Sequence, residues 1–133
     1  MITNDDKFMF TADMFQCVCQ WDISKQNLVR NCGEISKAAI CSMVVSVDGK
    51  YLFTGHYNGV LGQWGIHEGK MVKDFKKVHS RGFRSMEVTD CGRYLFTVDT
   101  FGRLYQWSLA TGGLMKKYDK VHQSEIYSVI ATV

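Results

Sequence analysis

The sequence predicts an all-β protein made of three copies of one unit, each with four short antiparallel strands. Three observations support this prediction: tryptophans recur at a fixed interval, strand-like runs alternate with turn dipeptides, and no window combines a helical period with helix caps. Short strands joined by tight turns pair antiparallel, because a tight turn reverses the chain. We therefore expect a repeat protein without helices over the 133 residues.

The repeat is 43 residues long and shows in several residue types at once. Each tryptophan follows a glutamine, and a Phe-Thr pair ends ten residues before it. The tryptophans are Trp21, Trp64 and Trp107. The threonines are Thr11, Thr54 and Thr97. Matching at this density predicts repeat units of about 1–43, 44–86 and 87–133 within a single domain.

The turn signals of the middle unit place its strands. Asn58-Gly59 is a strong signal for a two-residue hairpin, and Asp48-Gly49 and Glu68-Gly69 mark two further turns. The runs between them are apolar and strand-like. We expect the four strands at about 38–46, 50–56, 60–66 and 71–75. The strands of the outer units follow by adding or subtracting the period.

A period of this length, four strands per unit and a tryptophan closing the third strand are typical of WD repeats. The tryptophan dipeptides are Trp21-Asp22, Trp64-Gly65 and Trp107-Ser108, of which the first is the literal motif. His79 and His122 stand where the family has a histidine ahead of the innermost strand. The chain therefore resembles the WD-repeat family over essentially its whole length. The resemblance implies a partial β-propeller of three four-stranded blades.

The resemblance also implies a structural hydrogen-bond network in each blade. In the family a histidine, a hydroxyl on the second strand, a turn aspartate and the tryptophan satisfy one another's buried polar groups. The threonines, the tryptophans, His79 and His122 match these positions, whereas the first unit has Ser36 in place of the histidine. The aspartate position holds Phe15, Asn58 and Phe101. Asp13 and Asp99 stand two residues earlier, and the sequence leaves open whether they replace it.

The first and last residues fall at the same position of the repeat. Residues 1–3 correspond to 44–46 and to 130–132, so the first unit lacks most of its innermost strand and residues 124–132 form a spare one. Propellers usually have about 4–8 blades. We therefore expect either a part of a larger propeller or a head-to-tail homodimer that closes a ring of six blades. The first alternative is favoured.

Aromatic residues occupy hairpin turns that normally take polar residues. They are Phe15, Tyr57 and Phe101. In the family these hairpins open onto the face most used for partners, and exposed aromatic residues are typical interface anchors. Packing against the neighbouring blade is the alternative. Arg81, Arg84 and Tyr127 precede or begin innermost strands near the same face, and we expect them to line its rim.

No pattern typical of catalysis or metal binding stands out. The sequence has no nucleophile elbow, phosphate-binding glycine loop or zinc-protease helix, and Cys17-Val18-Cys19 has no second cysteine pair. His56 and His67 are expected at surface or turn positions. We therefore expect no enzyme activity, no metal and no cofactor. An odd count of five scattered cysteines favours a reducing compartment.

Charge and hydropathy favour a cytoplasmic protein, and the resemblance to WD repeats implies one that binds other proteins. The net charge of +3 gives no argument for specific nucleic-acid binding, and no apolar run is long enough to span a membrane. Lysines repeat at the period after the fourth strands, as either a solvated loop set or a basic patch. They are Lys73, Lys76, Lys77, Lys116, Lys117 and Lys120. The expected function is a non-catalytic interaction scaffold or adaptor. The alternatives are a structural component of a cytoskeletal or ciliary assembly and an enzyme hosted on a propeller.

Overall fold

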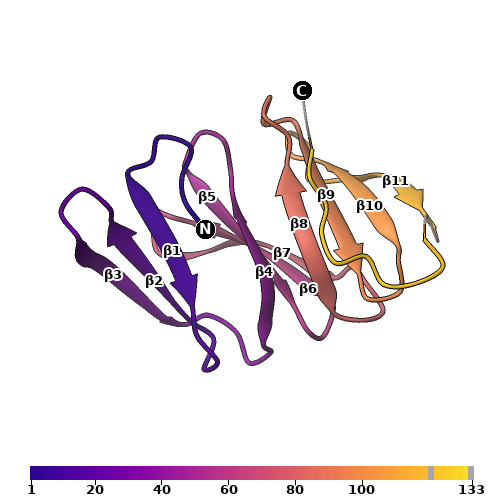
Figure 1. Ribbon diagram of the computed structural model, residues 1–133, viewed down its shortest axis with the longest axis horizontal. Coiled ribbons are helices and arrows are strands. Elements are labelled where there is room, and N and C mark those ends of the chain that lie inside the picture. The colour runs from indigo at the N-terminus through magenta and orange to yellow at the C-terminus, as the bar shows by residue number, and fades with distance from the viewer. Residues whose placement is uncertain (120–121, 132–133) are drawn as a thin grey trace.

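The computed structural model describes residues 1–119 and 122–131 and shows eleven β-strands and no helix within them (Figure 1). The strands are β1 (Phe8–Ala12), β2 (Cys17–Asp22), β3 (Asn27–Glu34), β4 (Ile40–Val45), β5 (Tyr51–His56), β6 (Val60–Gly65), β7 (Lys70–Lys77), β8 (Phe83–Val88), β9 (Tyr94–Asp99), β10 (Leu104–Ser108) and β11 (Leu114–Tyr118). The predicted all-β class is confirmed. The four strands expected in the middle unit are all present, and only the last, β7, extends beyond its predicted end.

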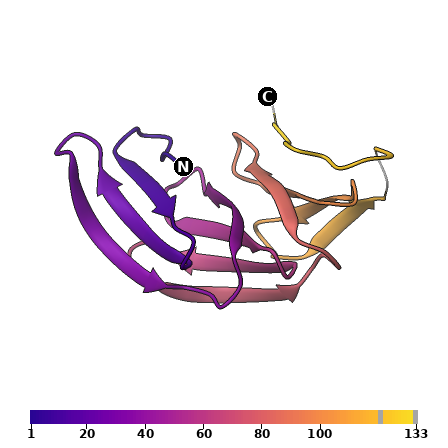
Figure 2. The same cartoon turned by 60° about the horizontal axis from the view of Figure 1, so that its bottom comes forward.

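The strands form three separate antiparallel sheets in which neighbours in sequence are neighbours in space. The orders are β1-β2-β3, β4-β5-β6-β7 and β8-β9-β10-β11. Figure 2 shows the three sheets arranged in an arc, with β1, β4 and β8 on the inside and β3, β7 and β11 on the outside. Each sheet is therefore one radial layer, and the turns between strands gather at its two ends.

Two apolar cores lie between consecutive sheets. The first joins Phe10 and Val18 of the first sheet to Val45 and Leu52 of the second. The second is larger and joins the second sheet to the third; its buried members are Val44, Phe53, Leu61, Phe83, Met86, Val88, Leu95, Tyr105 and Trp107. Burying a side chain of this size contributes about 1.5–3 kcal/mol. Packing between sheets therefore holds the repeats together.

Strand β5 of the second sheet is covered on both faces, and this explains its sequence. In β5 every residue from Leu52 to His56 is buried, because a sheet lies on each side of it. An apolar run without alternation is expected for a strand buried on both faces. In β10 burial alternates, with Tyr105 and Trp107 turned into the core. The third sheet has a neighbouring sheet on one side only.

The first sheet has three strands instead of the four expected for a blade. Residues 1–3 supply a remnant of the missing innermost strand: Ile2 forms a single bridge with Met9, and the backbone N–H of Phe10 donates to the carbonyl of Met1 (2.6 Å). The second and third sheets are four-stranded blades as predicted, and the first has three strands, as expected for a unit that lacks most of its innermost strand.

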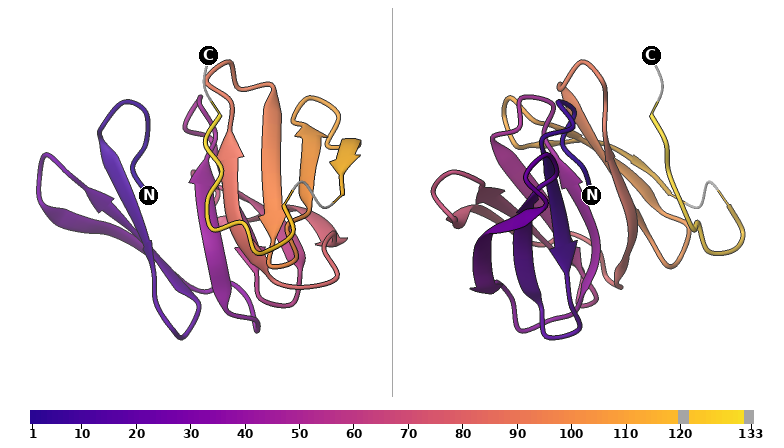
Figure 3. Two further views of the ribbon diagram at one scale, coloured as in Figure 1. Left: turned by 45° about the vertical axis from the view of Figure 1, so that its right-hand side comes forward. Right: turned by 60° about the vertical axis from the view of Figure 1, so that its left-hand side comes forward.

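The spare strand expected at 124–132 is also absent from the described part of the chain, residues 124–131; Thr132 lies outside the described residues. This segment runs alongside β8 but does not pair with it as a strand (Figure 3). Its links to β8 are the pair Arg84–Glu125 (3.2 Å) and a bond from the Val129 N–H to the Ser85 hydroxyl (3.3 Å). An innermost strand is normally held by the second strand of its own sheet, and this segment has no such partner among the described residues.

Candidate interaction surface

The third sheet contains a chain of polar contacts that starts at its tryptophan. The indole Nε1 of Trp107 donates to Oγ1 of Thr97 (3.1 Å), and Nε2 of His79 lies 2.8 Å from the same oxygen. Nδ1 of His79 lies 3.3 Å from Oδ2 of Asp99. The Asp99 carboxylate can only accept, so it favours the neutral His79 tautomer with the proton on Nδ1, in which Nε2 accepts the Thr97 hydroxyl proton. Asp99 thus replaces the turn aspartate of the family's network, a question that the sequence left open.

Burial keeps the His79 ring neutral. Loss of solvation lowers the pKa of His79 to about 4, although the nearby Asp99 carboxylate opposes the shift. The Nδ1–H does not point well at the carboxylate, so neither Nδ1 nor Oδ2 has a well-formed hydrogen bond despite their short separation. We therefore regard this contact as an electrostatic attraction between the ring N–H and the carboxylate.

The same carboxylate shapes the turn that follows β9. Oδ1 of Asp99 accepts hydrogen bonds from the backbone N–H groups of Phe101 (2.9 Å) and Arg103 (3.1 Å). The guanidinium of Arg103 donates to Oγ of Ser80 (2.6 Å) and lies 3.8 Å from Oδ2 of Asp99. The buried network therefore fixes both the β9–β10 turn and the loop that precedes β8.

The middle sheet builds its network with a different histidine. The indole of Trp64 donates to Oγ1 of Thr54 (2.8 Å), whose hydroxyl lies 2.9 Å from Nε2 of His56. Nδ1 of His56 lies 3.1 Å from the carbonyl oxygen of Ala38. His56 occupies the repeat position of Asp99, and Ser36 occupies that of His79. The expectation of a surface or turn position for His56 is wrong: the residue is buried, and burial lowers its pKa.

The first sheet retains only the tryptophan–threonine pair. The indole of Trp21 donates to Oγ1 of Thr11 (2.9 Å) in an exposed setting, and Asp13 caps its turn through the N–H groups of Phe15 and Cys17. His122 was expected to serve a network, but it is exposed and has no hydrogen bond to the described residues. Its position in the repeat follows the third sheet, so the threonine and tryptophan that would partner it fall beyond residue 133.

The predicted turn aromatics lie at one end of the sheets, the lower edge of Figure 1. This turn face comprises the turns after β1, β5 and β9 and the loops before β4 and β8. The exposed fractions are 68% for Phe15, 74% for Tyr57 and 47% for Phe101. The alternative, that they tuck against a neighbouring sheet, is not what the structure shows.

The loop before β8 is pinned between two turns of this face. Gly59 has a positive φ of 82°, and a Cβ there would collide with the carbonyl oxygen of His79. A Cβ on Gly82 would lie 2.8 Å from the carbonyl oxygen of Tyr57. On the other side, the N–H of Thr100 donates to the carbonyl of Gly82 (3.3 Å). The three segments are therefore packed backbone to backbone.

The three other rim residues divide into two clusters. The guanidinium of Arg81 lies over the Phe101 ring at 5.2 Å, and that of Arg103 lies over the same ring at 5.5 Å. Arg84 lies over the ring of Tyr127 at 4.7 Å and pairs with Glu125. Arg84 therefore binds the segment 124–131, whereas Arg81 has no ion pair with a described residue.

The lysine cluster has structural contacts on the outer strands. Lys73 donates to the carbonyl of Gly112 in the third sheet (3.4 Å), and Arg30, at the same repeat position, donates to the carbonyls of Ile66 (2.9 Å) and His67 (3.0 Å) in the second. Lys116 has the same position in the third sheet and lies over the Tyr118 ring. The Lys77 side chain and Lys120 lie outside the described residues.

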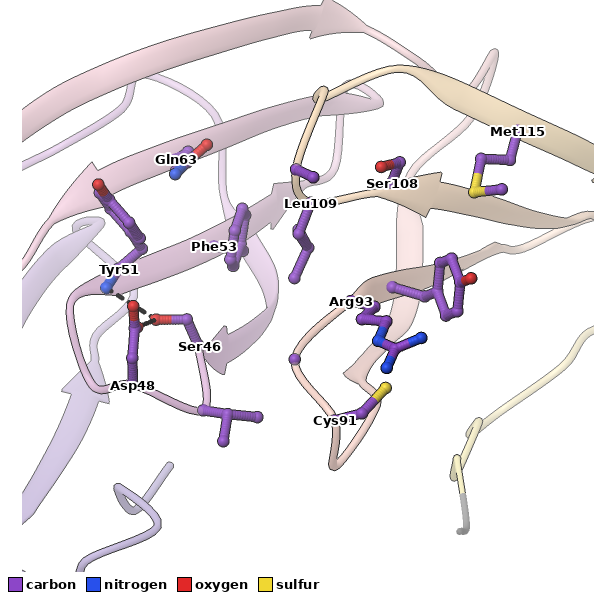
Figure 4. Close-up of a pocket in the computed structure, with 14 residues that line it drawn as sticks. Ser46, Asp48, Tyr51, Phe53, Gln63, Cys91, Arg93, Ser108, Leu109 and Met115 are labelled. Carbon is purple, nitrogen blue, oxygen red and sulfur yellow. Dashed lines mark hydrogen bonds between the residues drawn. The ribbon is translucent and has the colours of Figure 1, made fainter.

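A pocket of about 650 Å³ lies at the opposite end, between the second and third sheets (Figure 4). Phe53, Leu109 and Met115 form its apolar part. Asp48 and Arg93 are among its polar residues, and Asp48 accepts a hydrogen bond from the Ser46 hydroxyl (2.6 Å). The two hairpin turns that border the pocket are therefore shaped by local side-chain bonds rather than by a convergent set of reactive groups.

Within residues 1–119 and 122–131 no group of three or more His, Cys, Asp and Glu side chains is placed to hold a metal ion. The five cysteines are free thiols. No helix in this part of the chain has the length and apolar character needed to cross a membrane.

Two residues important for this face were missed from the sequence. His56 looked like a turn residue, yet its repeat position carries aspartate in both other units, which is the signal that its role is polar and structural. Arg103 had no signal, because its repeat partners are Cys17 and Val60. Its importance depends on the contacts with Ser80 and Phe101, which only the folded structure shows.

Solved structures with a similar fold were found, although no protein-family profile and no curated protein matches the chain. One is titled "Structure of U3-55K", with a TM-score of 0.88 and 17% identity; the similarity covers 99% of this chain and 41% of that one. Another is titled "Crystal structure of RRP9 WD40 repeats", with a TM-score of 0.87, 18% identity and the same coverages. The chain thus spans 41% of the length of each.

These likenesses define the fold. The chain has a WD-repeat β-propeller fold, of which its three sheets are consecutive blades. The resemblance drawn from the tryptophan repeat is confirmed at this level.

Proposed function

We propose that the chain is a non-catalytic protein-interaction scaffold that binds its partners through the turn face. One observation carries the proposal: Phe15, Tyr57 and Phe101 are exposed together at one end of the sheets. Large exposed aromatic side chains are typical anchors of protein interfaces, because burial of each one removes a large apolar area from water. The WD-type fold supports such a role, since its loops present a fixed surface.

The perturbed titratable groups fit this proposal. The pKa values of His56 and His79 are lowered, which in many proteins marks an active site. Here each ring lies inside a buried network with a tryptophan, so the shift has a structural cause. Neither ring lines the pocket between the second and third sheets.

Photo-crosslinking tests the proposal. A photoreactive phenylalanine is placed at Tyr57 or Phe101, and in a control at Val47 on the opposite end, which is also exposed. After irradiation in cells, we expect discrete protein adducts from the first two positions and few from the third. Equal labelling at both ends contradicts the assignment of the face. Phe101→Ser should remove the same adducts from the Tyr57 position while thermal unfolding is unchanged.

The outer wall favours a structural role as the second candidate function. The outermost strands expose apolar residues at two adjacent repeat positions in all three blades. They are Leu28, Val29, Met71, Val72, Leu114 and Met115. Contiguous exposed apolar side chains mark association surfaces. We propose lateral packing in a cytoskeletal or ciliary assembly as the alternative. Val29→Asp combined with Val72→Asp should abolish such packing, measured by co-sedimentation, without changing turn-face crosslinks.

We also propose that a further blade packs on the outward flank of the third blade; a longer chain is the favoured source of this blade, and the first blade of a second copy is the alternative. Phe10 and Phe53 are buried against the next blade, whereas Phe96, at the same repeat position, is only half-buried. Leu61 is likewise buried, whereas Leu104, at the same repeat position in the third blade, is half-buried. If a second copy supplies the blade, light scattering behind a sizing column should give a dimer mass for the chain and a monomer mass for Leu104→Lys. A monomeric wild-type chain contradicts a second copy and favours blades from a longer chain.

A further inference from the structure

The turn face carries one cluster that the repeat itself does not require. Arg81 and Arg103 both lie over the ring of Phe101, at 5.2 and 5.5 Å. The repeat positions of Arg81 are occupied elsewhere by Ala38 and Ser124, and those of Arg103 by Cys17 and Val60. The other blades therefore fold without these cations, and the arginine–aromatic cluster belongs to the third blade alone.

The cluster is held in place before any partner arrives. Arg103 is fixed by Ser80 (2.6 Å) and by its N–H bond to the buried carboxylate of Asp99 (3.1 Å). Arg81 belongs to the loop whose backbone is packed against Tyr57 and tied to Thr100. A prearranged guanidinium loses little conformational freedom on binding, so more of its interaction energy appears as affinity.

The charges of the cluster are unequally compensated. Asp99 lies 3.8 Å from Arg103 and offsets part of its charge, and Glu125 pairs with Arg84 nearby. No described carboxylate forms an ion pair with Arg81, which is exposed beside the half-exposed ring of Phe101. The face thus offers a guanidinium with free donors next to an apolar anchor. A guanidinium binds a carboxylate through two parallel hydrogen bonds.

We infer that the cluster of Arg81, Phe101 and Arg103 binds an acidic protein segment in which a carboxylate pairs with Arg81 and an adjacent apolar group packs on Phe101. This inference rests on the proposed scaffold function and specifies the chemistry of the partner. A protein segment fits better than a nucleic acid, because a base needs a whole free face of the ring for stacking, whereas an apolar side chain needs only the part of Phe101 that the two arginines leave exposed.

The experiment measures fluorescence anisotropy with a labelled peptide of alternating glutamate and glycine. Its glutamine counterpart and an oligothymidine of equal charge are the comparison probes. Arg81→Glu reverses the central charge, and Arg93→Glu, exposed at the opposite end, makes the same change in net charge. Arg81→Lys keeps the charge but removes the planar pair of donors.

We expect the glutamate peptide to bind the wild-type chain and to bind Arg81→Glu about tenfold more weakly, which is the typical cost of losing one charge-assisted pair. Arg81→Lys should fall between these two, and Arg93→Glu should match the wild type. Equal weakening by Arg81→Glu and Arg93→Glu would show only a bulk charge effect and overturn the inference. So would tighter binding of oligothymidine, or equal binding of the glutamine peptide.

The outcome separates this inference from the proposed function. If photo-crosslinks form at Tyr57 and Phe101 but the glutamate peptide does not bind, the face is an interaction surface and its partner is not acidic. If neither is observed, the scaffold function itself is contradicted.

Discussion

The third and first blades share the tryptophan–threonine pair and an aspartate that caps the turn after the second strand, but they differ in how these groups are buried and linked. In the third blade the pair continues through His79 to Asp99, all buried, and Asp99 holds the turn that carries Phe101. In the first blade the indole of Trp21 and the hydroxyl of Thr11 meet in an exposed setting and continue to no histidine. One polar pair is therefore part of a core, and its counterpart lies on a surface.

The difference shows what the network does for the surface. The exposed cluster of Arg81, Phe101 and Arg103 lies on backbone segments that the buried Asp99 and its neighbours fix. Phe15 is more exposed than Phe101, and its turn is held by the cap of the exposed Asp13 and by a backbone bond from Ile35 to Gln16 (3.1 Å). The third blade thus presents a prearranged anchor, and the first blade an adaptable one.

The largest expected effect is the loss of the buried tryptophan. Trp107→Ala removes a ring packed against Phe75 and leaves the Thr97 hydroxyl oxygen without its indole donor, so it should cost about 3–5 kcal/mol in the free energy of unfolding. Trp21→Ala should cost about 1 kcal/mol, because that ring is already partly exposed. Urea unfolding of both variants measures the difference. Equal losses would mean that the two blades are equally packed.

Acid should weaken the third blade through His79. The pKa of His79 is about 4 in the folded chain and 6.5 in the unfolded chain. Between these two pH values the unfolded state therefore binds a proton more readily than the folded state. The stability from the neutral ring is complete above pH 6.5 and falls as the pH drops toward 4, by on the order of 3 kcal/mol. His79→Gln should be less stable at neutral pH and show a shallower loss toward acid. Parallel curves for the two proteins would rule out His79 as the source.

The middle blade offers an exchange that sharpens the comparison. Its histidine stands at position 56 and its serine at position 36, where the third blade has Asp99 and His79. His56→Asp alone buries a carboxylate without its partner and should cost about 3 kcal/mol. Adding Ser36→His rebuilds the arrangement of the third blade, so the double variant should regain about 1–2 kcal/mol. Strictly additive losses would show that the two positions do not communicate.

The smallest effect concerns the cations of the outer strands. Arg30→Ala removes the bonds to Ile66 and His67 and should cost about 1 kcal/mol or less, because the pair is near the surface. Lys116→Ala is the matched control at the same repeat position, where no such bond to a following blade is described. A larger loss for Lys116→Ala in thermal unfolding would contradict this account of the link between blades.

The sequence predicted what the repeat determines and missed what single residues determine. Period and turn residues placed the strands, since burial on both faces and tight turns constrain every unit alike. The repeat could not reveal that His56 replaces a loop histidine, because two substitutions twenty residues apart compensate each other only in the folded blade. The strand expected at 124–132 is not formed in the described residues. Its position in the repeat predicted a strand, but a segment becomes a β-strand only when a neighbouring strand pairs with it.

The central claim is that the buried network makes the turn of the third blade rigid and leaves that of the first blade loose. Amide hydrogen exchange, resolved by residue, tests it directly. The N–H groups of Phe101 and Arg103, bound to the buried Asp99, should be protected to nearly the level of β9, whereas those of Phe15 and Cys17, bound to the exposed Asp13, should exchange much faster. Equal protection in the two turns would contradict the claim.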